Sequence, residues 1–134
     1  IEEDKKTPIA PFPGPPPALG PYSLGVVGEG KFVFVSGMIP FNPATCRVER
    51  GTIAEQTELV LSNLKNVLEA GGATIADVVS CRVYLGDAKP ENFKQLNEVY
   101  AKYFGDSKPA RATIGAQMPG EFDVEIECIA VLDR

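Results

Sequence analysis

The segment from residue 52 to residue 72 carries the strongest local signal in the chain, and it limits the folds that the rest can join. Its first four residues, Thr52-Ile53-Ala54-Glu55, have the spacing of a capping box at a helix start. Apolar residues then recur at helical spacing, at Val60, Leu61, Leu64, Val67 and Leu68, and Gly71-Gly72 ends the pattern. The pattern predicts an amphipathic helix. Its apolar stripe is typical of packing against a core rather than of binding a cofactor.

Segments rich in β-branched and aromatic residues lie on both sides of this helix and predict strands. They cover residues 31–36, 78–85, 111–117 and 123–132, with a further short strand around 46–48 after the turn Asn42-Pro43-Ala44-Thr45. A second helix is expected from Pro90 to Phe104, because proline suits a first helical turn and Gly105 follows the apolar pattern. The order β(β)αβαββ predicts an α+β domain with two helices on a sheet.

The first 21 residues differ from the rest of the chain. They hold seven of the 12 prolines, and Pro15-Pro16-Pro17 disfavours a helix and removes backbone donors. We therefore expect an extended, proline-rich arm over residues 1–17 and a single domain over residues 18–134. The charge-rich first six residues are expected to be mobile, and residues 1–14 to be a docked or free tail without a role.

The chain contains no histidine. Its absence excludes Ser-His-Asp and Cys-His catalysis, imidazole bases and the usual zinc sites. The three cysteines are widely spaced and odd in number, which favours free thiols over a disulfide framework. Catalysis would depend on Arg, Glu, Asp, Tyr, Lys, Thr or Cys side chains, or on a water molecule held by backbone groups.

The charge balance limits the partners of the chain. The net charge is −5 and the basic residues are scattered, so nucleic acid is not an expected partner. No apolar run approaches the length of a membrane span, so no membrane partner is expected. We expect a cytoplasmic protein, with a mitochondrial location as the alternative.

Strand parity groups the polar residues of the last two strands, because alternate residues face opposite sides of a sheet. In segment 123–132, one face carries Val124, Ile126, Cys128, Ala130 and Leu132, and the other carries Glu125, Glu127, Ile129 and Val131. In segment 111–117, Ala112, Ile114 and Ala116 are expected to face the core, with Arg111, Thr113 and Gly115 opposite. If the two strands form a hairpin about residues 118–119, Arg111 shares the non-core face with Glu125 and Glu127.

That non-core face is too apolar to be left in water. Either Val33 and Val35 or Phe32 and Phe34 face away from the helices, and Ile129 and Val131 add to them. Two helices can cover only one side of the sheet, and apolar patches of this size usually mark an interface. We infer a homo-oligomer, with polar groups forming a site where the subunits meet.

Several short segments stand in a fixed order from Ala18 to the C-terminus. They are Gly20-Pro21-Tyr22-Ser23, Phe34-Val35-Ser36-Gly37-Met38-Ile39-Pro40, Glu55-Gln56-Thr57, Leu96-Asn97-Glu98-Val99-Tyr100, Tyr103-Phe104, Lys108-Pro109-Ala110-Arg111 and Val124-Glu125-Ile126-Glu127. Each is weak alone, but in this order and spacing they resemble the reactive-intermediate deaminases, also called the Rid, YjgF or L-PSP endoribonuclease family. The resemblance departs at Met38, at Leu24-Gly25 and around Cys46-Arg47, which affects the expected cleft lining.

The resemblance implies a chorismate-mutase-like α+β subunit with a mixed sheet, assembled as a homotrimer with three sites between subunits. It implies an enzyme of the 2-iminobutanoate/2-iminopropanoate deaminase type, without cofactor or metal. Such enzymes hydrolyse enamines and imines, such as 2-aminoacrylate, to 2-keto acids and ammonia. The implied partners are therefore small imines and keto acids.

The resemblance also implies a role for particular residues. Arg111 matches the arginine that binds the substrate carboxylate, and Glu125 matches the glutamate that holds the attacking water. Thr113 is expected to offer its backbone carbonyl, and its hydroxyl as well, to the water site. Tyr22, Gly37 and Asn97 match positions that line the cleft.

Each of these residues also has a structural interpretation. Arg111 could form a salt bridge to Glu127, and Glu127 could hold the water in place of Glu125. Tyr22 could anchor the arm, Asn97 could bridge its helix to a loop, and Cys81 and Cys128 are expected in the core. Two other functions stay open: an endoribonuclease or translation inhibitor, and a metabolite-binding trimer without catalysis.

Overall fold

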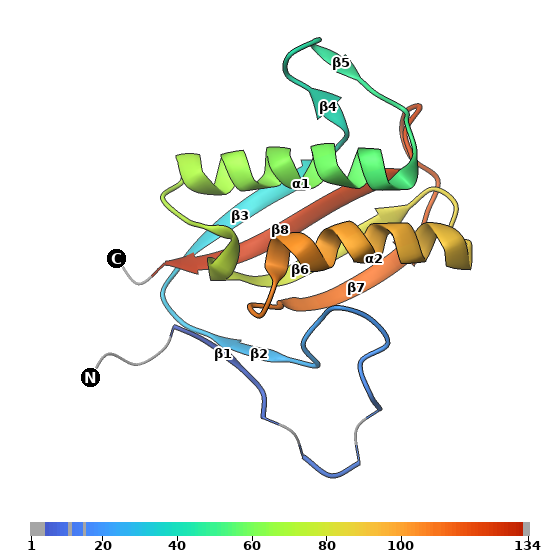
Figure 1. Cartoon of the computed structure of the whole chain (residues 1–134). Helices are drawn as coiled ribbons and strands as arrows, with labels where there is room; N and C mark the ends of the chain where they lie inside the picture. Colours follow the sequence, from blue (N-terminus) through green and yellow to red (C-terminus); the bar gives the residue numbers. More distant parts are fainter. Residues whose placement is uncertain (1–4, 11, 15, 133–134) are drawn as a thin grey trace.

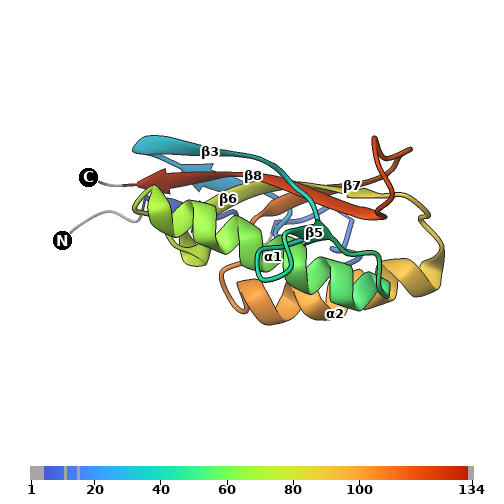
Figure 2. The same cartoon turned by 90° about the horizontal axis from the view of Figure 1, so that it is seen from above.

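The computed structural model describes residues 5–10, 12–14 and 16–132, which form one layer of helices on one layer of sheet (Figure 1). The helices α1 (Ile53–Ala70) and α2 (Pro90–Phe104) lie side by side on the same face of the sheet. Figure 2 shows both helices below the strands, and no helix of the described residues covers the opposite face. We call that opposite face the open face. The predicted α+β class is confirmed.

Both helices begin and end as the sequence predicts. Thr52 caps α1, with its side chain accepting from the Glu55 amide and the Glu55 carboxylate accepting from the Thr52 amide. Pro90 occupies the first turn of α2. The predicted apolar stripe of α1 is buried except at Val67, which is 41% exposed on the outer side of the helix. The stripe packs on the sheet, so its interpretation as core is confirmed.

The main sheet has four strands in the order β3 (Lys31–Met38), β8 (Val124–Leu132), β6 (Val78–Leu85) and β7 (Ala110–Gly115). β8 runs antiparallel to both of its neighbours, whereas β6 and β7 are parallel. The predicted hairpin between segments 111–117 and 123–132 is therefore wrong, because β6 lies between them. The chain passes from β6 through α2, and such a crossover returns it parallel to the strand it left.

Three shorter elements complete the described chain. β4 (Phe41–Asn42) and β5 (Arg47–Val48) form the short hairpin expected around residues 46–48. A 3-10 turn, η1 (Ile75–Asp77), precedes β6. β1 (Lys6–Pro8) pairs antiparallel with β2 (Val26–Gly28), and neither strand was predicted. The arm is therefore docked at residues 6–8, while residues 1–4, also expected to be mobile, lie outside the described residues.

The open face is partly apolar, as predicted. Phe32 is 57% exposed and Phe34 is 73% exposed, with ring centroids 6.0 Å apart, whereas Val35 is buried under the helices. Val131, expected on the exposed part of this face, is instead fully buried. β2 lies close above it, because a Cβ on Gly28 would be 3.6 Å from Val131 Cγ1. In the described chain, no helix is both long and apolar enough to cross a membrane.

Candidate functional site

Arg111 lies at the start of β7 with its guanidinium among three aromatic rings. Its Cζ is 4.8 Å from the ring centroid of Tyr100, 5.4 Å from that of Tyr22 and 5.5 Å from that of Phe93. Tyr100 and Phe93 belong to α2, so Arg111 points to the helix side of the sheet. Arginine stacks well on aromatic faces because its planar charge is weakly hydrated.

The predicted shared face of Arg111 and Glu125 is therefore wrong. Arg111 is paired with the buried Cys81 of β6, whereas Glu125 is paired with Tyr84, which points the other way. Ile114, expected in the core, is 45% exposed on the open face. Alternation correctly placed Arg111 and Thr113 on the same face of β7. The more apolar face of this strand, however, is not the face that packs against the helices. An edge strand can direct a charged residue inward when the inner site is polar.

The polar atoms around Arg111 lack partners among the described residues. Asn97 Oδ1, Arg111 Nε, Arg111 Nη1 and Thr113 Oγ1 are buried without a hydrogen bond. No described carboxylate lies within salt-bridge distance of Arg111, and burial lowers the pKa of this guanidinium. Unsatisfied buried polar groups are costly. The arrangement therefore favours an anionic ligand that accepts from Arg111.

The segment 18–23, which continues the proline-rich arm and is called the arm from here on, supplies one side of a cluster around Arg111. We call this set the arginine cluster; it consists of Gly20, Tyr22, Phe93, Asn97, Tyr100 and Arg111. Ser23 holds the arm on the sheet edge, where its amide donates to Pro109 O at 3.0 Å and its hydroxyl to Lys108 O at 2.6 Å. Gly20 approaches the charge closely, since a Cβ there would lie 3.1 Å from Arg111 Nη2 and 3.5 Å from Asn97 Nδ2. Tyr22 thus contributes its ring to the cluster, while the anchoring contacts of the arm come from Ser23.

Glu125 lies on the open face, against the backbone of Gly37. A Cβ on Gly37 would be 2.9 Å from Glu125 Cδ and closer still to its carboxylate oxygen, so only glycine leaves room for this side chain. Glu125 also borders a cavity of about 370 Å³ beside residues 116–119. No described residue forms a hydrogen bond or ion pair with its carboxylate. Glu125 is therefore available to hold a water molecule.

Glu127, the alternative acid, is already engaged. The Tyr84 hydroxyl donates to Glu127 Oε1 at 2.7 Å, and this hydrogen bond raises the pKa of Tyr84. Arg82 Nη1 lies 3.9 Å from the same oxygen. The salt bridge between Arg111 and Glu127, the alternative interpretation of Arg111, is not among the ion pairs of the described residues. The geometry favours Glu125 over Glu127 as the free carboxylate.

The cysteines do not offer a reactive thiolate. Cys81 and Cys128 are buried in the core, as predicted. Burial raises the pKa of Cys81 to about 12 and raises that of Cys128 as well, so both stay protonated near neutral pH. Within the described residues, no group of three His, Cys, Asp or Glu side chains is placed to hold a metal ion.

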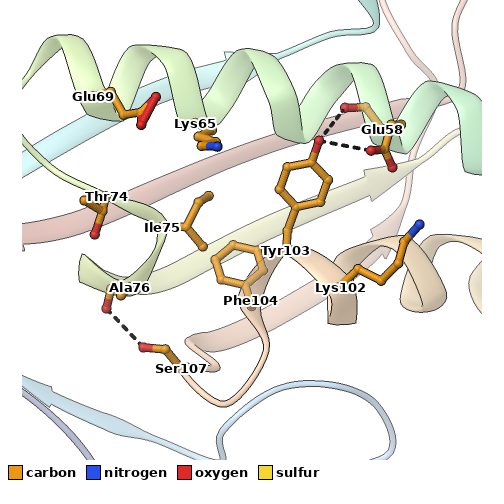
Figure 3. A pocket seen from close by; sticks show the side chains of 10 residues that line it. All are labelled: Glu58, Lys65, Glu69, Thr74, Ile75, Ala76, Lys102, Tyr103, Phe104 and Ser107. Carbon is orange, nitrogen blue, oxygen red and sulfur yellow. Dashed lines mark hydrogen bonds between the residues drawn. The ribbon is translucent and has the colours of Figure 1, made fainter.

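A cavity of about 610 Å³ lies elsewhere, between α1, α2 and η1 (Figure 3). Several of its polar side chains already have partners. The Tyr103 hydroxyl donates to Glu58, and the Ser107 hydroxyl donates to Ala76 O. None of the buried unpartnered side-chain atoms in the described chain belongs to its lining. The chemistry points to the arginine cluster instead.

Three residues of the arginine cluster were not predicted as site residues. Phe93 and Tyr100 fit the apolar pattern of α2, which indicates core positions, although Tyr100 also ends one of the segments that carried the resemblance. Gly20 belongs to a motif that carried the resemblance, but only the structure shows how close its backbone comes to Arg111. The structure places α2 over β7, and this packing brings the two aromatic rings of the helix against the Arg111 guanidinium.

Comparisons with known proteins place the chain in a family. The family model described as Endoribonuclease L-PSP matches residues 14–132. A RutC family protein of Pyrococcus horikoshii is 44% identical over 116 residues, 86% of this chain and 90% of that protein. The chloroplastic Reactive Intermediate Deaminase A of Arabidopsis thaliana is 42% identical over 118 residues, 87% of this chain and 62% of that protein.

A solved structure supports the same assignment. The structure of a protein of unknown function from the conserved Rid family of Yersinia pestis matches with a TM-score of 0.85 at 30% identity, covering 96% of this chain and 100% of that one. The resemblance carried by the sequence segments is thereby confirmed. This chain belongs to the L-PSP endoribonuclease family, which includes the Rid and RutC proteins.

Proposed function

We propose that the chain is an enamine and imine deaminase, which hydrolyses 2-imino acids, such as the imine tautomer of 2-aminoacrylate, to 2-keto acids and ammonia. The observation that carries the proposal is the buried guanidinium of Arg111, which lacks a carboxylate partner among the described residues. A guanidinium binds a carboxylate through two parallel hydrogen bonds, here from Nε and a terminal nitrogen. Asn97 Oδ1 can accept from the imine N–H of the same ligand. The name of the Arabidopsis thaliana relative supports this activity.

Hydrolysis needs a water molecule and no redox partner. The water oxygen adds to the imine carbon, and the imine nitrogen takes up a proton. The resulting carbinolamine then expels ammonia and leaves the 2-keto acid. Glu125 orients the water, and the backbone carbonyl of Thr113 supplies a second acceptor for it. Because the imine carbon is already electrophilic, positioning the water contributes much of the acceleration.

The two groups act together only if they come from different subunits. Arg111 points to the helix side of the sheet and Glu125 lies on the open face. We propose a homotrimer in which the arginine cluster of one subunit meets Glu125 and Gly37 of the next. The exposed rings of Phe32 and Phe34 give this assembly an apolar surface to bury.

The test uses 2-aminoacrylate, generated in the cuvette from serine by a pyridoxal-phosphate dehydratase. The purified protein should accelerate pyruvate formation, and Arg111→Ala should lose at least about a hundredfold in kcat/KM, equivalent to about 2.7 kcal/mol. Arg111→Lys should recover only part of this, because lysine cannot form the bidentate pair. A correctly assembled protein that leaves the rate unchanged would contradict the proposal.

The same preparations separate the other functions. The description of the family model gives an endoribonuclease some support, although the acidic chain disfavours RNA binding. If the protein is a nuclease, its RNA cleavage should persist after repeated purification and should be lost in the Arg111→Ala variant. Tight keto-acid binding without turnover would instead identify a metabolite sensor.

A further inference from the structure

A mostly apolar groove runs beside the arginine cluster, between α2 and the arm. It has a volume of about 470 Å³. Its apolar walls come from Leu19, Pro21, Phe93 and Ala101. Lys94 and Glu98 also line the groove, so their opposite charges leave it without a net charge. The groove is distinct from the larger cavity of Figure 3, which involves the α1 side of α2.

The groove is continuous with the arginine cluster through two residues of α2. Phe93 lines the groove, and its ring lies 5.5 Å from Arg111 Cζ. Asn97 lines the groove and also carries the buried, unpartnered Oδ1. Phe93, Asn97 and Ala101 are four residues apart in turn, so they form one stripe along the helix. A ligand held by Arg111 can therefore extend along this stripe.

The arm keeps the connection open. Leu19 and Pro21 both line the groove, and Gly20 between them has no side chain to separate it from Arg111 Nη2. The Leu19 amide donates to the Tyr22 hydroxyl at 3.0 Å, which fixes the backbone at this point. The Leu19 side chain is nevertheless 80% exposed. A large apolar side chain held over a groove in this way becomes buried when an apolar ligand fills the groove.

We propose that this groove receives the side chain of the substrate, so that the enzyme prefers 2-imino acids with long aliphatic or aromatic side chains over 2-iminopropanoate. The inference rests on the proposed function and names its substrate class. Arg111 holds the carboxylate, Asn97 faces the imine nitrogen, and the stripe from Phe93 to Ala101 contacts the side chain. The neutral lining disfavours imines derived from acidic or basic amino acids.

The test compares three imines, generated in situ from alanine, leucine and phenylalanine by an L-amino-acid oxidase. Catalase removes the hydrogen peroxide that the oxidase releases. Semicarbazide captures free imine, so loss of the semicarbazone reports hydrolysis by the protein. We expect kcat/KM to be at least about tenfold higher for the leucine and phenylalanine imines than for the alanine imine, since each buried methylene favours binding severalfold.

Two variants test the groove itself. Ala101→Phe fills it and should reduce the preference for the larger imines to near unity, and Leu19→Ser, at an exposed position that folding does not depend on, should lower the preference in the same direction. Lys102→Phe is the matched control, because it adds the same ring on the side of α2 that lines the other cavity, and it should keep the preference.

The outcomes separate the two proposals. The groove assignment alone would be overturned if the wild type showed an equal or reversed preference among the imines. It would also be overturned if both groove variants lost kcat/KM equally for all three imines. Failure to hydrolyse any imine would overturn the deaminase proposal and the groove assignment with it.

Discussion

At the scale of single residues, Gly37 decides where the Glu125 carboxylate can lie. A Cβ at residue 37 would approach Glu125 Cγ to 3.1 Å and Cδ to 2.9 Å, closer than side chains ordinarily come. We expect Gly37→Ala to turn the carboxylate away and to lower kcat at least about tenfold, since displacing a reacting group by about 1 Å can cost a hundredfold. KM should change little, because Arg111 still holds the substrate. Steady-state kinetics with a 2-imino acid measure both constants.

A second variant separates displacement of Glu125 from damage to the backbone. Because the obstructing atoms belong to the flexible end of Glu125, the clash in Gly37→Ala should lower the free energy of unfolding only modestly, by about 1 kcal/mol or less. In a Glu125→Ala background this loss should largely disappear, because the obstructing carboxylate is gone. Urea unfolding of the four proteins gives the comparison. An equal loss in both backgrounds would show that residue 37 must be glycine for its own backbone alone.

At the scale of elements, the sequence predicts where helices and strands lie along the chain better than it predicts which strands pair in the sheet. The capping box at Thr52 and the proline at residue 90 are local signals, and both helices begin where they predict. β8 was expected beside β7, but β6 separates them, because strand order depends on the helical crossover rather than on local pattern. β1 and β2 have three residues each, too few to show an alternation.

The candidate site was predictable in its residues and not in its geometry. Arg111, Tyr22 and Asn97 were expected together, and the structure brings them together around Gly20. Glu125 was expected on the same face as Arg111, and it lies on the other. The error came from β7, where the apolar Ile114 faces outward and the charged Arg111 inward. Alternation shows which residues share a face, but only the packing of α2 shows which face is inside.

The strand β1 is held by Lys6, whose environment predicts a pH dependence. Lys6 Nζ donates to Ser107 O at 2.8 Å, to Ser107 Oγ at 2.9 Å and to Ala76 O at 3.1 Å. Burial lowers the pKa of Lys6 from 10.5 to about 8, with the other contributions opposing this shift. Between pH 8 and 10.5 the unfolded chain therefore binds a proton at Lys6 that the folded chain has lost. Stability should rise with pH across this window.

Comparison with Lys6→Met isolates this contribution. The unfolding free energy of the wild type relative to the variant should increase from pH 8 to pH 10.5. The increase should be modest, because Lys6 is only half buried and solvent screens the effect. Carbon-13 NMR of the lysine Cε atoms gives a direct check, with Lys6 titrating near pH 8. Titration of Lys6 together with the bulk of the lysines would contradict the expected burial of its charge.

At the scale of the whole molecule, the open face predicts the assembly. Phe34 is 73% exposed beside Phe32 on this face. If the face is buried between subunits, Phe34→Arg should shift the protein from trimer to monomer in sedimentation, because a buried unpaired charge is strongly unfavourable. Val67→Arg is the control, since Val67 is also a partly exposed apolar residue but lies on the helix layer. A trimer that persists in Phe34→Arg would place the interface elsewhere.

The opposite orientation of Arg111 and Glu125 makes a sharper prediction about where the sites are. If each site takes Arg111 from one subunit and Glu125 from the next, Arg111→Ala and Glu125→Gln each inactivate every site of a homotrimer. When the two variants are unfolded together and refolded as a mixture, some sites pair a wild-type Arg111 with a wild-type Glu125. Random assembly of equal amounts into a closed ring restores about a quarter of the sites.

Activity of the co-refolded mixture should therefore approach about a quarter of the wild-type value, while the same variants refolded separately and then mixed stay inactive. The rescue needs no new contact, only an exchange of subunits, so it distinguishes an intersubunit site from one built within a single chain. In a single-chain site both variants are inactive in every combination. A mixture that stays inactive, despite mixed trimers detected by native mass spectrometry, would show that Arg111 and Glu125 do not act across a subunit boundary.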